Sequence, residues 1–220
     1  MPLLGECLPE RFRREVRLVF WDFDGVIKDS VTVKTEAFVQ LFESFGDEVS
    51  RRVRAHHEAH GGMSRFEKLP LYMAWAGLPV TEAGIASYCR QFSDIALRRV
   101  IAAPWVAGVE RILRENPYAQ EFVLVTATPQ DEMMEILAAI DLRPCFSEVF
   151  GAPTKKGAAI RDCLSRREMP LFRCLMIGDA KADWDAAEEN GIPFLLRRHA
   201  SNQAVFRNYT GDSVEDFVGL

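Results

Sequence analysis

Cysteine is scarce and scattered in this chain of 220 residues. There are five cysteines and no C-x-x-C pair, so their odd number and wide spacing indicate neither a disulfide framework nor a zinc site. Long apolar runs are also missing, since none approaches the roughly 20 residues that a membrane span needs. The charged N-terminal stretch MPLLGECLPERFRRE is not typical of a signal peptide. We therefore expect a cytoplasmic protein that has no membrane segment.

The chain lacks an excess of positive charge. Lys and Arg number 27 against 32 for Asp and Glu, and the formal net charge is -5. A surface for nucleic acid or for an anionic membrane needs basic side chains over a whole face, so neither partner is expected. Hydrophobic residues make up 48% of the chain, which suits a globular protein of one domain with a sizeable insert.

Four short apolar runs are present, and each ends in a polar residue. Continuous runs of this length, rich in Val, Leu and Ile, are typical of strands buried on both faces of a parallel sheet. The runs are VRLVFWD to Asp22, FVLVT to Thr126, CLMIGD to Asp179 and IPFLLR to Arg197. Helical patterns such as DEMMEILAAID and GAAIRDCLSRR lie between them. This alternation of strand and helix predicts an α/β fold with a Rossmann-like parallel sheet.

The segment of residues 33–103 interrupts the alternation. It contains helix-like stretches, such as TEAFVQLFESFG and RFEKLPLYMAWAG, and no comparable strand. We therefore predict a core domain of residues 1–32 and 104–220, and a small all-helical domain of residues 33–103 inserted after the first strand.

Two carboxylates lie two residues apart in the stretch FWDFDGVIKDS. On an extended backbone, Asp22 and Asp24 project to the same side and can face one point in space. Like charges this close repel each other unless a cation or a shared proton intervenes. Gly25 permits a tight turn and a close approach of the backbone to a ligand. The stretch therefore indicates a site for a cation and an anionic substrate.

Polar residues end two further runs, at Thr126 and Asp179. Ligands of open α/β sheets bind beyond the carboxyl ends of the strands. We therefore expect Asp22, Thr126 and Asp179 to face one crevice.

Taken together, these motifs are similar to those of the haloacid dehalogenase superfamily of phosphatases and phosphomutases. DFDGVIKDS, the run ending in Thr126, a lysine after GAPT, and GDAKAD occur in the family's order over nearly the full chain. The helical insert resembles the cap of the subclass that includes phosphoglycolate phosphatase and β-phosphoglucomutase. The resemblance implies a phosphoric monoester hydrolase whose cap closes over the crevice and selects the leaving group.

The resemblance also implies catalytic roles. Asp22 is expected to attack the phosphoryl group and become an aspartyl phosphate, and Asp24 to act as general acid and base. Thr126 is expected to donate a hydrogen bond to a phosphoryl oxygen, with its neighbour Ala127 also contacting substrate.

A lysine is expected to hold Asp22 as an anion and to neutralise charge in the transition state. GAPTKKGAAI offers both Lys155 and Lys156. Lys156 is favoured, because in relatives with a similar loop the lysine directly precedes the helix.

Mg²⁺ is the implied cofactor, since it prefers oxygen ligands and keeps several waters. Its expected protein ligands are the carboxylates of Asp22 and Asp179 and the backbone carbonyl of Asp24. Asp183 would lie one helical turn beyond Asp179 and orient the metal shell or its waters. The alternative for Asp183 is a solvated position on the acidic helix ADWDAAEEN.

Basic residues of the insert are candidates for substrate contacts. In HHEAHGGMSRFEKL, the Gly-x-Ser-Arg segment is similar to the cap segment of β-phosphoglucomutase, so Arg65 is expected to contact substrate, with a salt-bridged surface arginine as the alternative. His56 and His60 share a helical face and are expected to shape the cap or touch substrate rather than bind a metal. Lys34 stands where β-phosphoglucomutase has a histidine, and it would meet an anionic substrate or be solvated.

The sequence therefore predicts a Mg²⁺-dependent phosphatase for a small phosphorylated metabolite, with phosphoglycolate or a sugar phosphate as the leading classes. A phosphomutase that uses the same aspartyl phosphate is the alternative enzyme, and Lys34 weakens it. A catalytically silent metabolite-binding protein on the same fold is the alternative from another class.

Overall fold

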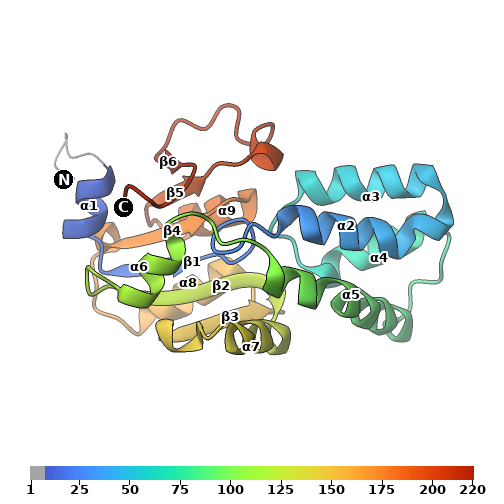
Figure 1. The fold of residues 1–220 in the computed structure, drawn as a ribbon, viewed down its shortest axis with the longest axis horizontal. Coiled ribbons are helices and arrows are strands. Elements are labelled where there is room, and N and C mark those ends of the chain that lie inside the picture. Colours follow the sequence, from blue (N-terminus) through green and yellow to red (C-terminus); the bar gives the residue numbers. More distant parts are fainter. Residues whose placement is uncertain (1–7) are drawn as a thin grey trace.

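A six-stranded sheet forms the centre of the molecule, whose computed structural model describes residues 8–220. All neighbouring strands are parallel, in the order β3-β2-β1-β4-β5-β6 (Figure 1). The strands are β1 (Leu18–Trp21), β2 (Glu121–Pro129), β3 (Glu148–Ala152), β4 (Cys174–Gly178), β5 (Phe194–Arg197) and β6 (Ser213–Val214). The predicted α/β fold with a parallel sheet is therefore confirmed.

Two strands, β3 and β6, do not belong to the predicted set of four. They form the two edges of the sheet. Most of β3 is only half-buried, and β6 has two residues. Because an edge strand buries less apolar surface than a central one, neither carries the continuous apolar run that marks β1 and β4.

Helices cover both faces of the sheet. One face carries α1 (Leu8–Arg14), α6 (Val109–Glu115) and α7 (Gln130–Ala139), and the other carries α8 (Lys156–Ser165) and α9 (Lys181–Glu189). In β1, Val19 and Trp21 pack in the first hydrophobic layer, whereas Leu18 and Phe20 pack in the second. Successive side chains of a strand point to opposite faces, so burial of both faces requires the unbroken apolar run.

Four helices between β1 and Pro104 form a helical bundle at one end of the molecule (Figure 1). They are α2 (Val31–Phe42), α3 (Asp47–Ala59), α4 (Arg65–Trp75) and α5 (Glu82–Ala102). The bundle has its own hydrophobic core, which includes Phe38, Phe42, Tyr72 and Phe92. The division into two domains at residues 33 and 103 stays a prediction.

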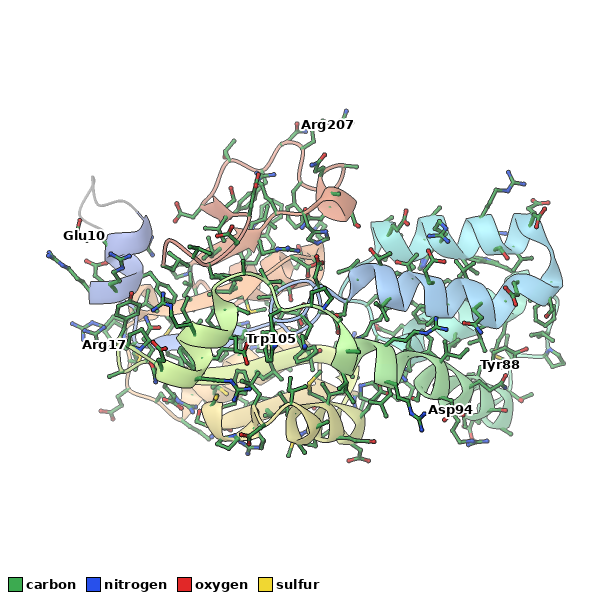
Figure 2. All side chains as sticks on the ribbon, viewed as in Figure 1. Glu10, Arg17, Tyr88, Asp94, Trp105 and Arg207 are labelled. Atoms are coloured by element: carbon green, nitrogen blue, oxygen red, sulfur yellow. The ribbon has the colours of Figure 1, made fainter. Side chains whose placement is uncertain are left out.

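The two connections between the helical bundle and the sheet lie side by side. The N–H of Asp29 donates to the carbonyl of Pro104 at 2.8 Å, and the N–H of Val106 donates to the carbonyl of Ile27 at 3.1 Å. Trp105, labelled in Figure 2, forms a β-bridge with Lys28 at this crossing. Both connections therefore enter the sheet layer together, next to the carboxyl end of β1.

Short 3-10 helices complete the described structure. They are η1 (Glu43–Phe45), η2 (Arg143–Cys145), η3 (Leu171–Arg173) and η4 (Ala200–Asn202). Over residues 8–220, no helix combines the length and the apolar character needed to cross a membrane. The first seven residues, on which part of the signal-peptide argument depends, lie outside the described residues.

Candidate active site

The predicted crevice is a cavity at the carboxyl edge of the sheet. β1, β2 and β4 are adjacent and parallel, so their carboxyl ends share this edge. Asp22 directly follows β1, Asp179 directly follows β4, and Thr126 lies near the end of β2. All three line a cavity of about 70 Å³. The topology thus brings together three residues that are far apart in the sequence.

The helical bundle forms the other wall of this cavity. Its contribution comes from α2, α3, α4 and α5, and includes Lys34, Phe38, His57, Arg65 and Lys68. The cavity therefore lies between a wall rich in carboxylates and a wall rich in basic and aromatic side chains.

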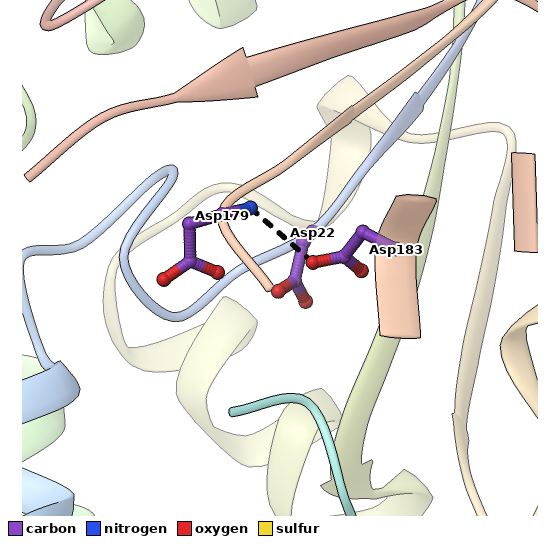
Figure 3. Close-up of side chains that lie close together, drawn as sticks. All are labelled: Asp22, Asp179 and Asp183. Atoms are coloured by element: carbon purple, nitrogen blue, oxygen red, sulfur yellow. Dashed lines mark hydrogen bonds between the residues drawn. The ribbon is translucent and has the colours of Figure 1, made fainter. Parts of the chain in front are cut away.

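Three buried aspartates form an acidic triad, consisting of Asp22, Asp179 and Asp183 (Figure 3). Each offers a carboxylate oxygen, and these oxygens lie within 4.8 Å of one another. Asp183 is fully buried in the first turn of α9, so it is not the solvated position that the acidic helix allowed. Oδ2 of Asp183 accepts hydrogen bonds from the N–H groups of Asp179 at 3.2 Å and Ala180 at 3.0 Å. A set of carboxylate oxygens fits a hard divalent cation, the class to which Mg²⁺ belongs.

The surroundings of the acidic triad disfavour the ionised form of its carboxyl groups. Burial and then repulsion by Asp183 raise the pKa of Asp22 to about 7, although Lys156 acts in the opposite direction. Burial is also the main cause that raises the pKa values of Asp179 and Asp183. A cation bound between the three carboxylates would favour their ionised form, and would so oppose the effects of burial and of mutual repulsion.

Lys156 is the lysine that contacts the acidic triad. It is the first residue of α8, and its Nζ lies 2.9 Å from Oδ1 of Asp22 and 2.5 Å from Oδ1 of Asp183. Burial by itself would lower its pKa, but the two carboxylates raise the pKa above the ordinary lysine value. Lys155 is exposed. The lysine favoured from the sequence is therefore the one placed at Asp22.

Asp24 has partners that are separate from the acidic triad. The hydroxyl of Ser30 donates to its Oδ1 at 2.7 Å, the hydroxyl of Thr128 donates to its Oδ2 at 3.2 Å, and Lys34 forms an ion pair with Oδ2. Burial would raise the pKa of Asp24, but the Lys34 ammonium and the hydroxyls hold it below its usual value. Asp24 is therefore ionised in this conformation, and Lys34 is not solvated.

The turn after β1 passes very close to Asp179. Gly25 has φ +77°, and a Cβ at this position would lie 2.3 Å from Oδ2 of Asp179. A close approach of the backbone was expected here, and the structure shows that one neighbour is a carboxylate of the acidic triad. This packing needs a residue that adopts the left-handed backbone conformation readily and that has no Cβ, and only glycine meets both conditions.

The end of β2 presents two threonines to the cavity. Thr126 and Thr128 are two residues apart on the strand, so their side chains share a face. Both line the cavity with Ala127, and the N–H of Thr128 donates to Oγ1 of Thr126 at 3.2 Å.

The loop after β5 holds Asp179 in place. Nε2 of His199 lies 2.8 Å from Oδ2 of Asp179, and the side-chain amide of Asn202 donates to the Asp179 carbonyl at 2.8 Å. Neither residue was predicted, because neither belongs to a motif. The one available signal was their position just beyond the fourth apolar run.

Arg65 of α4 lines the cavity but already has a carboxylate partner. Its guanidinium donates to both oxygens of Glu132 on α7, at 2.8 and 2.5 Å, and also to the hydroxyl of Ser93 at 2.6 Å. The alternative of a salt-bridged arginine therefore describes this conformation, although the pair is buried rather than on the surface. A substrate contact by Arg65 stays a prediction.

Of the three histidines at positions 56, 57 and 60, it is His57 that faces the cavity. It is buried, and its Nδ1 lies 3.0 Å from Nζ of Lys68. His56 and His60 stack on each other, with ring centroids 4.1 Å apart, and Nδ1 of His56 lies 3.1 Å from the hydroxyl of Tyr72. Among the residues that the structure describes, the one group of three or more metal-ligating side chains is the acidic triad, which contains no histidine.

A family model for haloacid dehalogenase-like hydrolases matches residues 19–196. The chain belongs to this family. A phosphorylated carbohydrates phosphatase from Thermotoga maritima is 27% identical over 190 residues, which cover 79% of this chain and 81% of the relative.

Solved structures share the fold of this haloacid dehalogenase-like hydrolase. A predicted phosphoglycolate phosphatase from Haemophilus somnus aligns with a TM-score of 0.71 at 17% identity, over 92% of this chain and 95% of its own. A candidate β-phosphoglucomutase from Thermotoga maritima aligns with a TM-score of 0.65 at 21% identity, over 90% of this chain and 94% of its own. At these identities the likeness shows the fold alone. Together with the family match, the comparisons confirm the predicted family and support the predicted class of enzyme, a phosphoric monoester hydrolase.

Proposed function

We propose that this haloacid dehalogenase-like hydrolase is a Mg²⁺-dependent phosphatase that acts on a small phosphorylated metabolite through an aspartyl phosphate at Asp22. The observation that carries the proposal is the contact of Asp22 with Lys156 inside the buried acidic triad. A nucleophilic carboxylate must be ionised when it attacks, and an adjacent ammonium favours that form.

Mg²⁺ would be held by the carboxylates of Asp22 and Asp179 and by the backbone carbonyl of Asp24. When bound, the ion supplies positive charge that offsets the repulsion between the nucleophile and the phosphoryl oxygens. Both oxygens of Asp183 already accept hydrogen bonds, from Lys156 and from backbone N–H groups. Asp183 is therefore suited to orienting the site rather than to replacing a metal ligand.

The reaction would proceed in two displacements. An oxygen of Asp22 attacks phosphorus, the bond to the leaving oxygen breaks, and Asp24 donates a proton to that oxygen. Asp24 then accepts a proton from water as the water attacks the aspartyl phosphate, and inorganic phosphate departs. Asp24 is ionised and paired with Lys34 in this conformation, so it must first leave this ion pair and take up a proton from solvent before it can donate one to the leaving oxygen.

Thr126 and Lys156 would hold the phosphoryl oxygens during both displacements. A hydroxyl and an ammonium at fixed positions stabilise the charge that builds up on these oxygens. Both side chains are buried, which keeps their orientation and strengthens the electrostatic interaction.

The helical bundle would act as the cap of the active site. A Cβ on Gly62, in the loop between α3 and α4, would lie 3.0 Å from Ala182 and 3.2 Å from Ala180, at the start of α9. This loop therefore packs directly against the segment that carries Asp179 and Asp183. A wall in this place excludes water and contacts the leaving group.

Two findings support phosphorylated carbohydrates or phosphoglycolate as the substrate class. The relative with 27% identity is a phosphorylated carbohydrates phosphatase, and one structural neighbour is a predicted phosphoglycolate phosphatase. The cavity of about 70 Å³ also favours a small ester.

Phosphate release from a panel of esters tests the proposal. The panel contains phosphoglycolate, sugar phosphates, nucleotides and p-nitrophenyl phosphate, each with Mg²⁺ or with EDTA. We expect release with Mg²⁺, little release with EDTA, and a loss of at least about 1000-fold in Asp22→Asn, because the nucleophile is removed. The matched control is Asp185→Asn, an exposed position on α9 that pairs with Lys181, and it should change the rate by no more than about twofold.

Two outcomes would contradict the proposal. One is a rate that EDTA does not change, and the other is an Asp22→Asn rate within about tenfold of the original. Poor hydrolysis of simple esters, together with isomerisation of a sugar phosphate that requires an added sugar bisphosphate, would instead indicate a phosphomutase.

A further inference from the structure

Lys68 is a buried cation in the cavity wall, and it has no carboxylate partner among the described residues. It lies on α4 and is 1% exposed. Its Nζ lies 3.0 Å from Nδ1 of His57 and 5.9 Å from the centroid of the Phe38 ring. An ammonium carries three N–H groups, and His57 accepts only one of them. Two donors are therefore left for a ligand in the cavity.

The other cations at this cavity are all paired with acids. Lys34 pairs with Asp24, and Arg65 pairs with Glu132. Lys156, behind the acidic triad, pairs with Asp22 and Asp183. Of the lysine and arginine side chains that line the cavity, Lys68 alone has no carboxylate within 4.0 Å in the described chain.

The surroundings of Lys68 disfavour a charge that has no counter-ion. Burial, followed by the charge of Lys34, lowers the pKa of Lys68 from 10.5 to about 7. Burial and the nearby Lys68 also lower the pKa of His57 well below its ordinary value, so His57 is a neutral acceptor. An anion that entered the cavity would remove this penalty, since a buried charge is tolerated when it is paired.

We propose that Lys68 is a specificity-determining residue that binds a second anionic group, a carboxylate or a phosphate, on the leaving group of the substrate. His57 positions the Lys68 ammonium by accepting one of its hydrogen bonds. The inference rests on the proposed phosphatase function, because that function places the transferred phosphoryl group at the acidic triad and the leaving group toward the helical bundle. The cavity of about 70 Å³ favours a small leaving group.

Pairs of esters that differ only in the second anion test this specificity. Phosphoglycolate is compared with 2-hydroxyethyl phosphate, and propane-1,3-diol bisphosphate with 3-hydroxypropyl phosphate. We expect kcat/KM of the unsubstituted enzyme to be higher by roughly 100-fold for the member that carries the second anionic group, in one of the two pairs. The pair that shows the preference identifies the second anion as a carboxylate or as a phosphate.

Lys68→Met removes the charge and keeps the buried volume. It should lower kcat/KM for the preferred ester with a second anionic group by roughly 100-fold, and change kcat/KM for the counterpart that lacks this group by no more than about threefold. Since Met suits a buried site, the variant should fold at least as well as the original chain. His57→Ala should lower kcat/KM for the preferred ester by about tenfold. His57→Gln, which keeps a hydrogen-bond acceptor, should restore part of this loss.

Proton uptake gives a second measurement that does not depend on turnover. Calorimetric binding of the preferred acidic ester to Asp22→Asn, in buffers of different ionisation enthalpy at about pH 8, reports protons taken up by the complex. We expect uptake approaching one proton with Lys68 present, and clearly less in the Asp22→Asn/Lys68→Met variant. The Asn at position 22 excludes a contribution from that carboxyl group.

The outcomes separate this inference from the proposed function. Equal losses in Lys68→Met for esters with and without the second anionic group, or the same proton uptake with and without Lys68, would overturn the inference while hydrolysis continued. Absence of phosphate release from every ester, including p-nitrophenyl phosphate, would overturn the proposed function, and the proton-uptake measurement would still decide the role of Lys68.

Discussion

Gly25, in the turn after β1, packs directly against Asp179 of the acidic triad. Its φ of +77° belongs to the left-handed region, and a Cβ would lie 2.3 Å from Oδ2 of Asp179. Asp179 cannot retreat freely, because His199 contacts the same oxygen and Asn202 holds the Asp179 carbonyl. The conformation of the turn and the position of a carboxylate of the acidic triad therefore depend on each other.

Gly25→Ala should impair both stability and activity. The left-handed backbone alone should cost about 1–2 kcal/mol in the free energy of unfolding. The added methyl group should also displace the Asp179 carboxylate, so phosphate release should fall by at least about 100-fold. Urea unfolding measures the first effect, and phosphate release with the preferred ester measures the second.

Gly77→Ala is the matched control. Gly77 has φ +70°, and a Cβ there would meet nothing within 4 Å. This variant should show the backbone cost, about 1–2 kcal/mol, with activity within about twofold of the original. If the two variants lose equal stability and equal activity, the steric argument for Gly25 is wrong.

A buried ion pair ties α4 of the bundle to α7 of the sheet layer. Arg65 and Glu132 form two hydrogen bonds, their side chains are 4% and 9% exposed, and Ser93 of α5 donates to the same carboxylate. Buried pairs of this kind are most costly when one partner is removed, since a charge is left without a counter-ion.

We therefore expect Glu132→Gln to destabilise the chain by about 3–5 kcal/mol, because it leaves the Arg65 guanidinium buried beside a neutral amide. The double variant Arg65→Met/Glu132→Gln should be more stable than Glu132→Gln alone. Urea unfolding of the single and double variants measures this coupling.

The exposed pair of Arg54 and Glu36 is the control for this contact. It joins α3 to α2 with two hydrogen bonds of similar length, but its side chains are 39% and 48% exposed. Glu36→Gln should cost no more than about 0.5 kcal/mol, because solvent screens the pair. A cost for Glu132→Gln as small as this would show that the α4 contact with α7 does not hold the bundle in place.

At the scale of the whole molecule, the acidic triad couples folding to pH. Burial and the neighbouring carboxylate raise the pKa of Asp22 from 3.8 to about 7. Between these two pH values the folded chain binds a proton that the unfolded chain has released. The free energy of unfolding should therefore fall as pH rises from about 4 to 7 in EDTA, and the fall should be smaller with Mg²⁺, which favours the ionised triad.

Mg²⁺ should accordingly stabilise the whole fold at neutral pH. At a concentration about 100 times its dissociation constant, the ion should add about 2.7 kcal/mol to the free energy of unfolding, and Tm should rise by several degrees. Thermal unfolding with MgCl₂ or EDTA measures the effect, with NaCl at equal ionic strength as a control for screening. An equal rise in Asp179→Asn would show that the ion acts elsewhere.

Local pattern in the sequence was sufficient for much of the fold and for the centre of the site. The runs that became β1, β2, β4 and β5 are visible because a strand buried on both faces must be apolar at every position. Asp22, Thr126 and Asp179 could be assigned to one crevice because adjacent parallel strands end at the same edge. The choice of Lys156 came instead from the resemblance to relatives in which the lysine directly precedes the helix.

Tertiary structure alone decided which distant side chains complete the cavity. The pairing of Arg65 with Glu132 joins residues 67 positions apart, and Asp179 meets His199 across 20 positions. No periodicity records such contacts, because they depend on how a separate bundle packs against the sheet. Lys68 shows this most clearly: on its helix it is one more basic residue, and only packing buries it in the cavity without an acid.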